Sequence, residues 1–431
     1  GATSTGNLIK GNYIGLDATG STFIAGSAQA SGVRLDPTSG GSNSIGGIAA
    51  GEGNVISGNS NTGVYTESTA AAGNLFFGNI IGPQANGTSW VTGNLQQNGI
   101  RIQASPNNTI GGNTALMRNV ISANETNGVL IAGAASTGNL IKGNYIGLGA
   151  TGTTFITGSS QNFGIQVTTT SGGLNIIGGI AAGEGNVISG NSDSGVYTIS
   201  TAAAGNSVFG NIIGPQANGT SWVTGNLQGN GIYIFSSPNN TIGGNTALMR
   251  NIISANETNG VVIVGATSTG NLIKGNYIGL DAAGTTFIAG STQNYGVQLN
   301  SSSGGSNTIG GSAAGEGNVI SGNSFYGVLT SSTAAAGNSV FGNIIGPQAN
   351  GTSWVTGNLQ GTGITIQSSP NNIIGGNTAF MRNIIAANET NGVYIDGATS
   401  TGNLIKGNYI GLDATGTTFI TGSTQNNGVV L

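Results

Sequence analysis

The sequence predicts an all-β chain coiled as a single-stranded parallel β-helix, and three observations support that prediction. The segment GNLIKGNYIGL occurs four times, with its first Asn at Asn7, Asn139, Asn271 and Asn403, so the copies lie 132 residues apart. Short runs of Val, Ile, Leu or Thr are bounded by Gly, Asn, Ser and Asp, which is typical of short strands with tight corners. Glycine makes up 82 of the 431 residues and no window has a 3.6-residue apolar period, which disfavours helix.

Each 132-residue unit divides into four turns. A Gly followed by a β-branched residue recurs at spacings of 31, 36, 29 and 36 residues, from Gly32 to Gly428, which predicts about thirteen turns of three strands. Such repeated strands satisfy their backbone groups by pairing with the turns above and below, so we expect parallel sheets. The expected organisation is one continuous β-helix over residues 1–431, with super-repeats 1–132, 133–264 and 265–396 and a partial copy, 397–431.

The long turns contain a lateral loop. The turn from Gly63 to Asn94 adds PQANGTSW before its last strand, and the same segment returns once in each later full super-repeat. Regular aromatic rings beside amides predict a multivalent glycan-binding platform. The alternative is that the ring folds back over the extra strand, as expected for Phe23 and Phe155 at corresponding places. The candidate ligand-binding residues are Trp90, Trp222, Trp354, Gln84, Gln216 and Gln348.

A column of asparagines is expected at one corner of the coil. Because these residues follow the turn-marking glycines at near-constant distances, they should lie above one another and hydrogen-bond along the axis. The alternative is that Asn is used only because it tolerates the left-handed conformation at corners. The predicted ladder comprises Asn7, Asn43, Asn74, Asn108 and Asn139. Beside it, Ile9, Ile45, Phe76 and Ile110 should form one apolar column of the core.

The segments NSIGGIAAGEGNVISGNSNTGVY, NTIGGNTALMRNVISANETNGVLI and NLIKGNYIGLDATG resemble those of large secreted bacterial proteins built from right-handed parallel β-helix repeats, similar to the pectate-lyase-like superfamily. The likeness covers the full chain. It implies a right-handed coil and a secreted, cell-surface location. It implies little about activity, since this fold occurs in lyases, hydrolases, epimerases, phage tailspikes and adhesins.

Composition excludes several functions. The chain has 9 basic and 13 acidic residues, a net charge of −4 and no basic run, which argues against nucleic acid or an anionic membrane as a partner. Its apolar runs are too short to cross a bilayer, so no membrane insertion is expected. Without Cys or His there is no disulfide, thiolate nucleophile or imidazole base. We expect no metal site and no cofactor.

The acidic residues do not form an evident catalytic set. The Asp of GLDA is replaced by Gly149 in the second copy, and the other unrepeated acids are scattered. Asp36 and Glu67 lie near the ends of neighbouring aligned strands and are the one pair that could act together. The plainer interpretation is that they are two solvated surface side chains. We therefore expect no enzyme and no catalytic residue.

The sequence favours a structural role. We expect a non-catalytic segment of an extracellular fibre, stalk or adhesin that self-associates head to tail or laterally. The chain begins and ends inside the repeat, which indicates a segment of a longer array. The alternatives are a glycan-binding surface module, or a polysaccharide-active lyase, hydrolase or epimerase.

Overall fold

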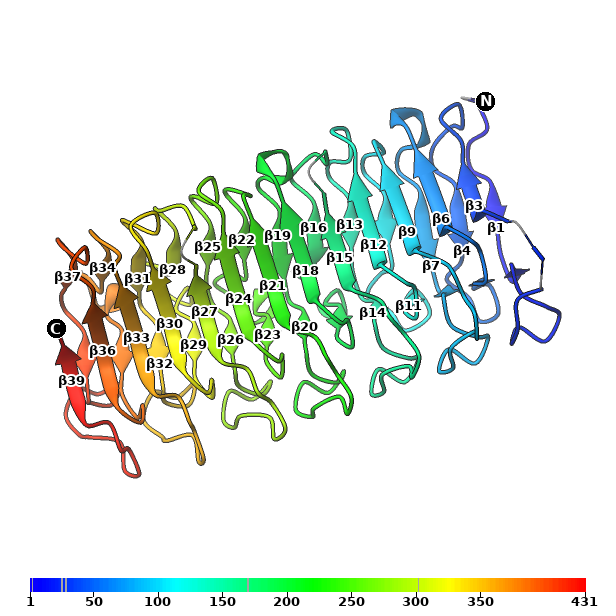
Figure 1. Ribbon diagram of the computed structural model, residues 1–431. Helices are drawn as coiled ribbons and strands as arrows, with labels where there is room; N and C mark the ends of the chain where they lie inside the picture. The colour runs from blue at the N-terminus through cyan, green and yellow to red at the C-terminus, as the bar shows by residue number, and fades with distance from the viewer. Residues whose placement is uncertain (2, 25, 28, 169, 301) are drawn as a thin grey trace. The chain divides into compact units, whose positions relative to one another are not determined.

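The computed structural model describes residues 1, 3–24, 26–27, 29–168, 170–300 and 302–431. In these residues, 39 short strands form three parallel sheets of thirteen strands each, and every third strand along the chain belongs to the same sheet (Figure 1). The predicted all-β parallel β-helix, with three strands per turn and about thirteen turns, is therefore confirmed.

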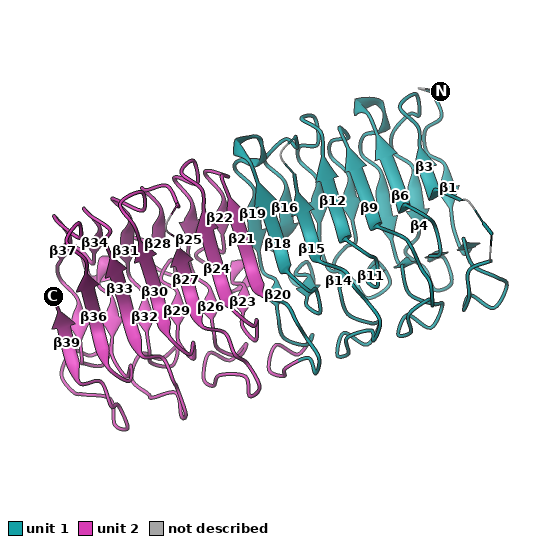
Figure 2. Cartoon of the chain, viewed as in Figure 1, with its two compact units in different colours: residues 1–217, 223–228 teal, residues 218–222, 229–431 magenta. Residues whose placement is uncertain are grey.

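The chain divides into two compact units, residues 1–217 with 223–228 and residues 218–222 with 229–431 (Figure 2). Each unit is described separately below. The organisation of residues 1–431 as one continuous domain stays a prediction.

The first sheet consists of strands of two or three residues. In the first unit its strands are β1 (Leu8–Ile9), β4 (Ser44–Gly46), β7 (Leu75–Phe77), β10 (Thr109–Ile110), β13 (Leu140–Ile141), β16 (Ile176–Gly178) and β19 (Ser207–Phe209). In the second unit they are β22 (Thr241–Ile242), β25 (Leu272–Ile273), β28 (Thr308–Gly310), β31 (Ser339–Phe341), β34 (Ile373–Ile374) and β37 (Leu404–Ile405).

The second sheet consists of two-residue strands. In the first unit these are β2 (Tyr13–Ile14), β5 (Val55–Ile56), β8 (Ile80–Ile81), β11 (Val120–Ile121), β14 (Tyr145–Ile146), β17 (Val187–Ile188) and β20 (Ile212–Ile213). In the second unit they are β23 (Ile252–Ile253), β26 (Tyr277–Ile278), β29 (Val319–Ile320), β32 (Ile344–Ile345), β35 (Ile384–Ile385) and β38 (Tyr409–Ile410).

The third sheet has the longest strands. In the first unit they are β3 (Ser31–Leu35), β6 (Thr62–Glu67), β9 (Asn98–Gln103), β12 (Asn127–Ala132), β15 (Phe163–Val167) and β18 (Ser194–Ile199). In the second unit they are β21 (Asn230–Phe235), β24 (Asn259–Val264), β27 (Tyr295–Leu299), β30 (Tyr326–Ser331), β33 (Thr362–Gln367), β36 (Asn391–Asp396) and β39 (Asn427–Val430). Four 3₁₀ turns occur between strands: η1 (Thr69–Ala71), η2 (Thr201–Ala203), η3 (Ala247–Met249) and η4 (Ala379–Met381).

The interior of each unit is built from columns of aliphatic side chains. The predicted column is confirmed, because Ile9 pairs with Ile45, Ile45 with Phe76, and Phe76 with Ile110 in register. The last three of these side chains are 0 % exposed. Burial of such residues is the main stabilising contribution in a fold without disulfides.

The glycine that marks each turn is required by the close approach of neighbouring strands. A Cβ at Gly63 would lie 2.6 Å from the carbonyl oxygen of Gly99, and a Cβ at Gly99 would lie 2.6 Å from that of Gly128. The glycine spacing therefore reports the stacking of third-sheet strands directly, which is why it predicts the number of turns.

The predicted asparagine ladder is present, and all its members except the first, Asn7, are buried. Asn7 Nδ2 donates to Asn43 Oδ1 at 2.7 Å, and the same bond continues through Asn74, Asn108 and Asn139 at 2.9–3.1 Å. Each Oδ1 also accepts the backbone N–H of the preceding ladder residue, as Asn74 does for Asn43 at 3.0 Å. One side chain thus satisfies the corner of its own turn and that of its neighbour. The second unit carries the equivalent ladder at Asn240, Asn271, Asn307, Asn338, Asn372 and Asn403.

Two further amide ladders were not predicted. One precedes the second sheet, and in the first unit its bonded members are Asn12, Asn54, Asn79, Asn119, Asn144, Asn186 and Asn211. The other precedes the third sheet and alternates Asn with Gln, in the order Asn59, Gln96, Asn124, Gln161, Asn191 and Gln228. Gln follows each lateral loop and Asn follows each tight corner. All three corners of the coil are therefore held by stacked amides.

The lateral loops form hairpins that stack on one another. Pro83 bridges to Trp90, and Leu16 bridges to Phe23 at the equivalent place. The PQANGTSW turn and the GLDA turn therefore carry the same kind of loop. The backbone N–H of Ala85 donates to the carbonyl of Gly20 in the preceding loop at 2.8 Å. The loops therefore add a stacked layer outside the corner between the second and third sheets.

The Lys and Arg residues that recur between the first and second sheets have recurring partners. Lys142 Nζ lies 2.7 Å from Glu184 Oε1, and the Arg118 guanidinium lies 4.1 Å from the centre of the Tyr145 ring. The same contacts occur for Lys10 with Glu52, Lys274 with Glu316, Arg250 with Tyr277 and Arg382 with Tyr409. These charges stabilise the loops between the first and second sheets.

Candidate functional site

The predicted aromatic loop residues are half-buried and tied to their own hairpins. Gln84 Nε2 donates to the carbonyl of Trp90 at 2.9 Å, and Gln348 does the same to Trp354. A Cβ on Gly158, in the next lateral loop, would lie 2.7 Å from the Trp90 ring. One part of the ring is thus covered by the next lateral loop.

The rest of the Trp90 ring borders an open hollow of about 450 Å³ between two lateral loops. Its lining is Thr88, Ser89, Trp90, Thr92, Thr154, Phe155, Ile156 and Thr157. Trp222 and Gln216 are half-buried like their copies. Glycan contact by these residues stays a prediction.

The acid of the GLDA segment is a loop-capping group. Asp17 Oδ1 accepts the Thr19 hydroxyl at 2.8 Å and the Ser21 N–H at 3.1 Å, and Oδ2 accepts the Thr22 hydroxyl at 2.9 Å. The hydrogen bonds from Thr19, Thr22 and Ser21 lower the pKa of Asp17 to about 2. Gly149 has no such side chain. Its backbone N–H nevertheless donates to the carbonyl of Thr154 at 3.0 Å, as the Asp17 N–H donates to the carbonyl of Thr22 at 2.8 Å.

Asp36 and Glu67 do lie close together, but an arginine joins them. Arg34 Nη2 is 3.2 Å from Glu67 Oε2, and Arg34 Nε is 3.9 Å from Asp36 Oδ2. A glycosidase pair needs one carboxyl group that carries a proton and one that is free to act as base or nucleophile. Here both carboxyl groups face the same guanidinium, so neither is free of a charged partner.

The outward face of the third sheet differs between super-repeats, whereas most of the scaffold does not. Residues 77–96, 209–228 and 341–360 are identical in sequence, including the whole lateral loop. In contrast, one column of side chains on the outward face of the third sheet, with one residue per turn, differs between copies at each of its four positions. Its members are Arg34, Tyr65, Arg101 and Leu130 in the first copy, Gln166, Tyr197, Tyr233 and Val262 in the second, and Gln298, Leu329, Thr365 and Tyr394 in the third.

The second outward column varies in the same way. Its members are Asp36, Glu67, Gln103 and Ala132 in the first copy, Thr168, Ile199, Phe235 and Val264 in the second, and Asn300, Ser331, Gln367 and Asp396 in the third. We call these two columns the variable face. Comparison of the three copies at a fixed distance from the turn-marking glycine would have revealed it from the sequence.

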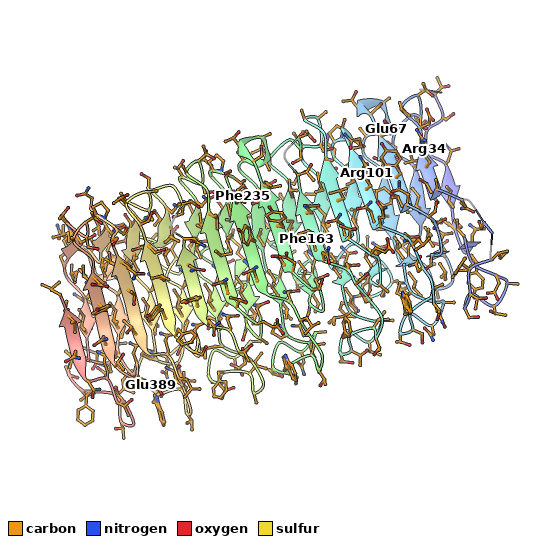
Figure 3. The ribbon with its side chains drawn as sticks, in the orientation of Figure 1. Arg34, Glu67, Arg101, Phe163, Phe235 and Glu389 are labelled. Atoms are coloured by element: carbon orange, nitrogen blue, oxygen red, sulfur yellow. The ribbon has the colours of Figure 1, made fainter. Side chains whose placement is uncertain are left out.

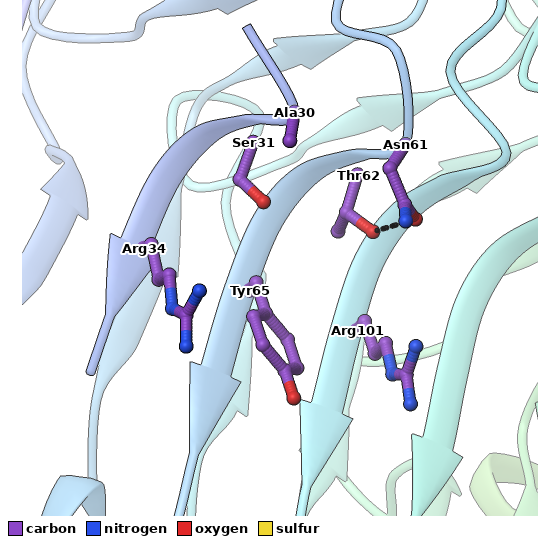
Figure 4. Close-up of a pocket in the computed structure, with 7 residues that line it drawn as sticks. All are labelled: Ala30, Ser31, Arg34, Asn61, Thr62, Tyr65 and Arg101. Carbon is purple, nitrogen blue, oxygen red and sulfur yellow. Dashed lines mark hydrogen bonds between the residues drawn. The ribbon is translucent and has the colours of Figure 1, made fainter. Parts of the chain in front are cut away.

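In the first super-repeat the variable face carries a cluster that sequence reasoning missed. Arg34 on β3 and Arg101 on β9 flank the Tyr65 ring on β6, with guanidinium carbons 5.5 and 5.3 Å from the ring centre (Figure 4). Figure 3 marks Arg34, Arg101 and the neighbouring Glu67 on these strands. Burial, and next the negative charge of Glu67, raise the pKa of the Tyr65 hydroxyl.

A small hollow lies along this cluster. It measures about 160 Å³ and is lined by Ala30, Ser31, Arg34, Asn61, Thr62, Tyr65 and Arg101. Arg101 Nη2 donates to Gln103 Oε1 at 3.0 Å, whereas Arg101 Nε is buried without a hydrogen-bond partner in the described residues. The hollow therefore presents hydroxyl and amide groups, one aromatic ring and an incompletely used guanidinium.

In the later super-repeats, aromatic side chains occur beside the variable face, at the starts of third-sheet strands. In the first unit the rings of Phe163 and Tyr197 stack with centres 5.0 Å apart. In the second unit Tyr295 lies 5.7 Å from Tyr326 and 6.1 Å from Phe325, and burial raises its pKa. Aromatic faces of this kind pack against the apolar faces of ligands.

The described residues contain no group of three or more acidic side chains placed to hold a metal ion. In the same part of the chain, no helix has the length and hydrophobicity that a membrane span requires.

Comparisons with known proteins do not identify an activity. No family model and no curated protein matches the sequence. Among solved structures, the Dettilon tailspike protein aligns over 93 % of this chain and 60 % of its own length, with 14 % identity and a TM-score of 0.41. This chain therefore spans less than two thirds of that tailspike.

Two epimerases align similarly. The A-module of a mannuronan C-5 epimerase from Azotobacter vinelandii shows 13 % identity and a TM-score of 0.36, over 93 % of this chain and 87 % of its own. A mutant of a periplasmic alginate epimerase shows 11 % identity and a TM-score of 0.31, over 88 % and 76 %. These similarities are too weak to argue for any activity. The strand order itself defines the chain as a parallel β-helix repeat protein.

Proposed function

We propose that this chain is a non-catalytic segment of an extracellular adhesin or surface stalk, in which a repeated scaffold presents the variable face to ligands. The observation that carries the proposal is the position of the differences between super-repeats. Exposure alone does not account for it, because Leu95, Leu227 and Leu359 are 58, 55 and 59 % exposed and yet identical. All eight positions of the variable face differ between copies, whereas most other positions are constant, and such a pattern is expected of a recognition surface.

The partners of the acidic groups favour the absence of catalysis. Asp36 and Glu67 share Arg34, Glu184 pairs with Lys142, and Asp17 caps its own loop. Hydrolysis or epimerisation of a sugar needs acid and base groups within reach of one bond. Secretion, a location at the cell surface and self-association into a fibre belong to the same proposal, as expected from the resemblance to secreted repeat proteins.

The proposal is tested by exchanging the variable face within the full chain. The variant Arg34→Gln, Tyr65→Leu, Glu67→Ser and Arg101→Thr places the residues of the third super-repeat in the first, so the scaffold already accommodates each of them. We expect its binding profile on a glycan array to change, while the variant Lys406→Gln, outside the variable face and the aromatic loops, keeps the original profile. An unchanged profile would contradict the proposed recognition surface. Release of sugar fragments by the full chain, lost in Glu67→Gln, would contradict the absence of catalysis.

A further inference from the structure

Arg34 and Arg101 are unusual among the cations of this chain. The seven other Lys and Arg residues recur at intervals of 132 residues, whereas these two occur in one copy only. Recurring cations such as Lys142 and Arg118 contact recurring partners within the scaffold. The scaffold folds without a cation at the two positions, because the third copy has Gln298 and Thr365 there. The pair is therefore not required by the fold.

Arg34 and Arg101 differ in how far their charges are neutralised. Arg34 is bound to Glu67 at 3.2 Å and lies 3.9 Å from Asp36. Arg101 has no carboxylate within 4.0 Å among the described residues, and its Nε is buried without a partner. The charge of Arg101 is therefore not neutralised by a carboxylate, and an anion beside its guanidinium would supply the missing opposite charge.

The charge of the cluster changes along the strands. Ser31, Asn61 and Thr62 lie at the strand starts and are uncharged, and Asp36 and Glu67 lie at the strand ends. A chain of closely spaced negative charges running along the strands would meet these two acids. A single anionic group that enters beside Arg101 avoids them. This arrangement disfavours a nucleic-acid backbone and favours one isolated charge on an otherwise neutral ligand.

We propose that the hollow between Arg34, Tyr65 and Arg101 binds a sugar residue that carries one anionic group, a carboxylate or a sulfate. The Arg101 guanidinium contacts the anion, the Tyr65 ring packs against the sugar, and Ser31, Asn61 and Thr62 contact its hydroxyl groups. The inference rests on the proposed function, because it names the ligand class of one patch of the variable face. The volume of about 160 Å³ suits one small group rather than a long segment.

The experiment measures binding of the full chain to three sugar probes by titration calorimetry. Glucuronate carries one carboxylate, glucose 6-sulfate carries one sulfate, and glucose is neutral. We expect binding to at least one anionic probe and none to glucose at the same concentration. Binding to glucuronate alone or to glucose 6-sulfate alone identifies which anion is recognised.

Three single variants show whether the binding occurs at this site. Arg101→Thr is expected to weaken binding about tenfold to a hundredfold, as for loss of a charge-assisted hydrogen bond. Arg34→Gln is expected to weaken it less, because Arg34 is already paired with Glu67. Lys406→Gln removes the same charge outside the hollow and is expected to leave the affinity unchanged.

Defined results would overturn the inference. These are no binding to either anionic probe, equal affinity for Arg101→Thr and the unaltered chain, or an equal loss in Lys406→Gln, which would indicate unspecific attraction. If the inference fails while other glycans still bind and the four-residue face variant alters their profile, the proposed function stands. If no profile depends on the variable face, both fail.

Discussion

The amide-lined corners and the variable face of the third sheet are built on the same turns and obey opposite rules. Asn119, at a corner, is 0 % exposed, bonds to the turns on both sides and is Asn in all three super-repeats. Arg101, on the face, contacts Tyr65 and Gln103 and is replaced by Tyr233 and Thr365 in the other copies. At these two positions, constancy across copies coincides with bonds that join turns, and variation coincides with a group that the stack does not need.

This difference has a physical cause. A corner amide must donate and accept along the axis, so its replacement leaves buried polar groups on two turns unsatisfied. An outward side chain on a parallel sheet needs only to avoid unfavourable contact with the same position one strand away. The following predictions test whether repeated positions stabilise the fold and unrepeated ones do not, from the largest expected effect to the smallest.

Asn119→Ala should cause the largest loss of stability. It removes four hydrogen bonds. The N–H and Nδ2 of Asn79 lose their acceptor, Asn119 Oδ1, and the Phe76 carbonyl and Asn144 Oδ1 lose their donor, Asn119 Nδ2. At about 1 kcal/mol per bond, the free energy of unfolding should fall by about 3–5 kcal/mol. Urea unfolding followed by circular dichroism measures it.

The matched control is Asn61→Asp, at an exposed position that precedes β6, beside the variable face. Asp stands at the equivalent position, Asp193, and keeps the oxygen that accepts the Thr62 hydroxyl. Its effect should stay within about 0.5 kcal/mol. Equal effects of the two variants would break the distinction between corners and face.

Gly158→Ala tests the stacking of lateral loops. Gly158 has a φ of 93°, and its Cβ would lie 2.7 Å from the Trp90 ring, so Ala adds a steric clash to backbone strain. Gly26 occupies the same place one super-repeat earlier and has a φ of 83°. A Cβ on Gly26 would have no atom of the described residues within 4 Å. Gly26→Ala should cost about 1 kcal/mol, and Gly158→Ala about 1–3 kcal/mol more. A shift of Trp fluorescence only in Gly158→Ala would place the extra cost at the ring, and equal costs would exclude it.

Glu184→Gln and Glu67→Ser compare a repeated ion pair with an unrepeated one. Glu184 lies 2.7 Å from Lys142 in a pair whose side chains are 23 and 16 % exposed, and the hydrogen bond from Lys142 lowers the Glu184 pKa. Its replacement should cost about 0.5–1 kcal/mol, and less in high salt. Glu67→Ser introduces the residue of the third copy and should change the thermal midpoint less. A larger effect at Glu67 would assign a structural role to the variable face.

The architecture was predictable because spacing and chemistry coincide. The glycine spacing follows from backbone contacts such as that of Gly63 with Gly99, and the first ladder follows those glycines at near-constant distance. The second ladder escaped prediction because loops of unequal length separate its members, by 42 residues from Asn12 to Asn54 and 25 from Asn54 to Asn79. The third escaped because Asn and Gln alternate in it.

The candidate site was only partly predictable. Asp36 and Glu67 were recognised as neighbours, but Arg34 between them and Arg101 beyond Tyr65 were not. Their juxtaposition requires the register of three strands far apart in the sequence, which the turn-marking glycines do encode. The contact of Trp90 with Gly158 could not be predicted in this way, since it depends on how deeply two hairpins stack.

Asp17 tests an intermediate case, a position repeated in three copies and absent from one. Its pKa is lowered to about 2 by hydrogen bonds from Thr19, Thr22 and Ser21. Because the folded-state pKa lies below the unfolded value of about 3.9, the stabilisation is complete above that value and is lost as pH falls through about 2. The difference in stability between the chain and Asp17→Gly should therefore be constant near neutral pH and shrink below about pH 4.

Gly149→Asp is the reciprocal variant, because Thr151, Thr153 and Thr154 stand where Thr19, Ser21 and Thr22 stand around Asp17. It should acquire the same pH dependence, with a smaller gain, since its Cβ would lie 3.1 Å from the carbonyl oxygen of Gly87. Titration of both carboxyl groups by NMR and unfolding between pH 2 and pH 7 measure the two effects. A normal pKa at both positions would mean that the loop closes through its backbone alone. The acid would then belong with the variable face rather than with the scaffold.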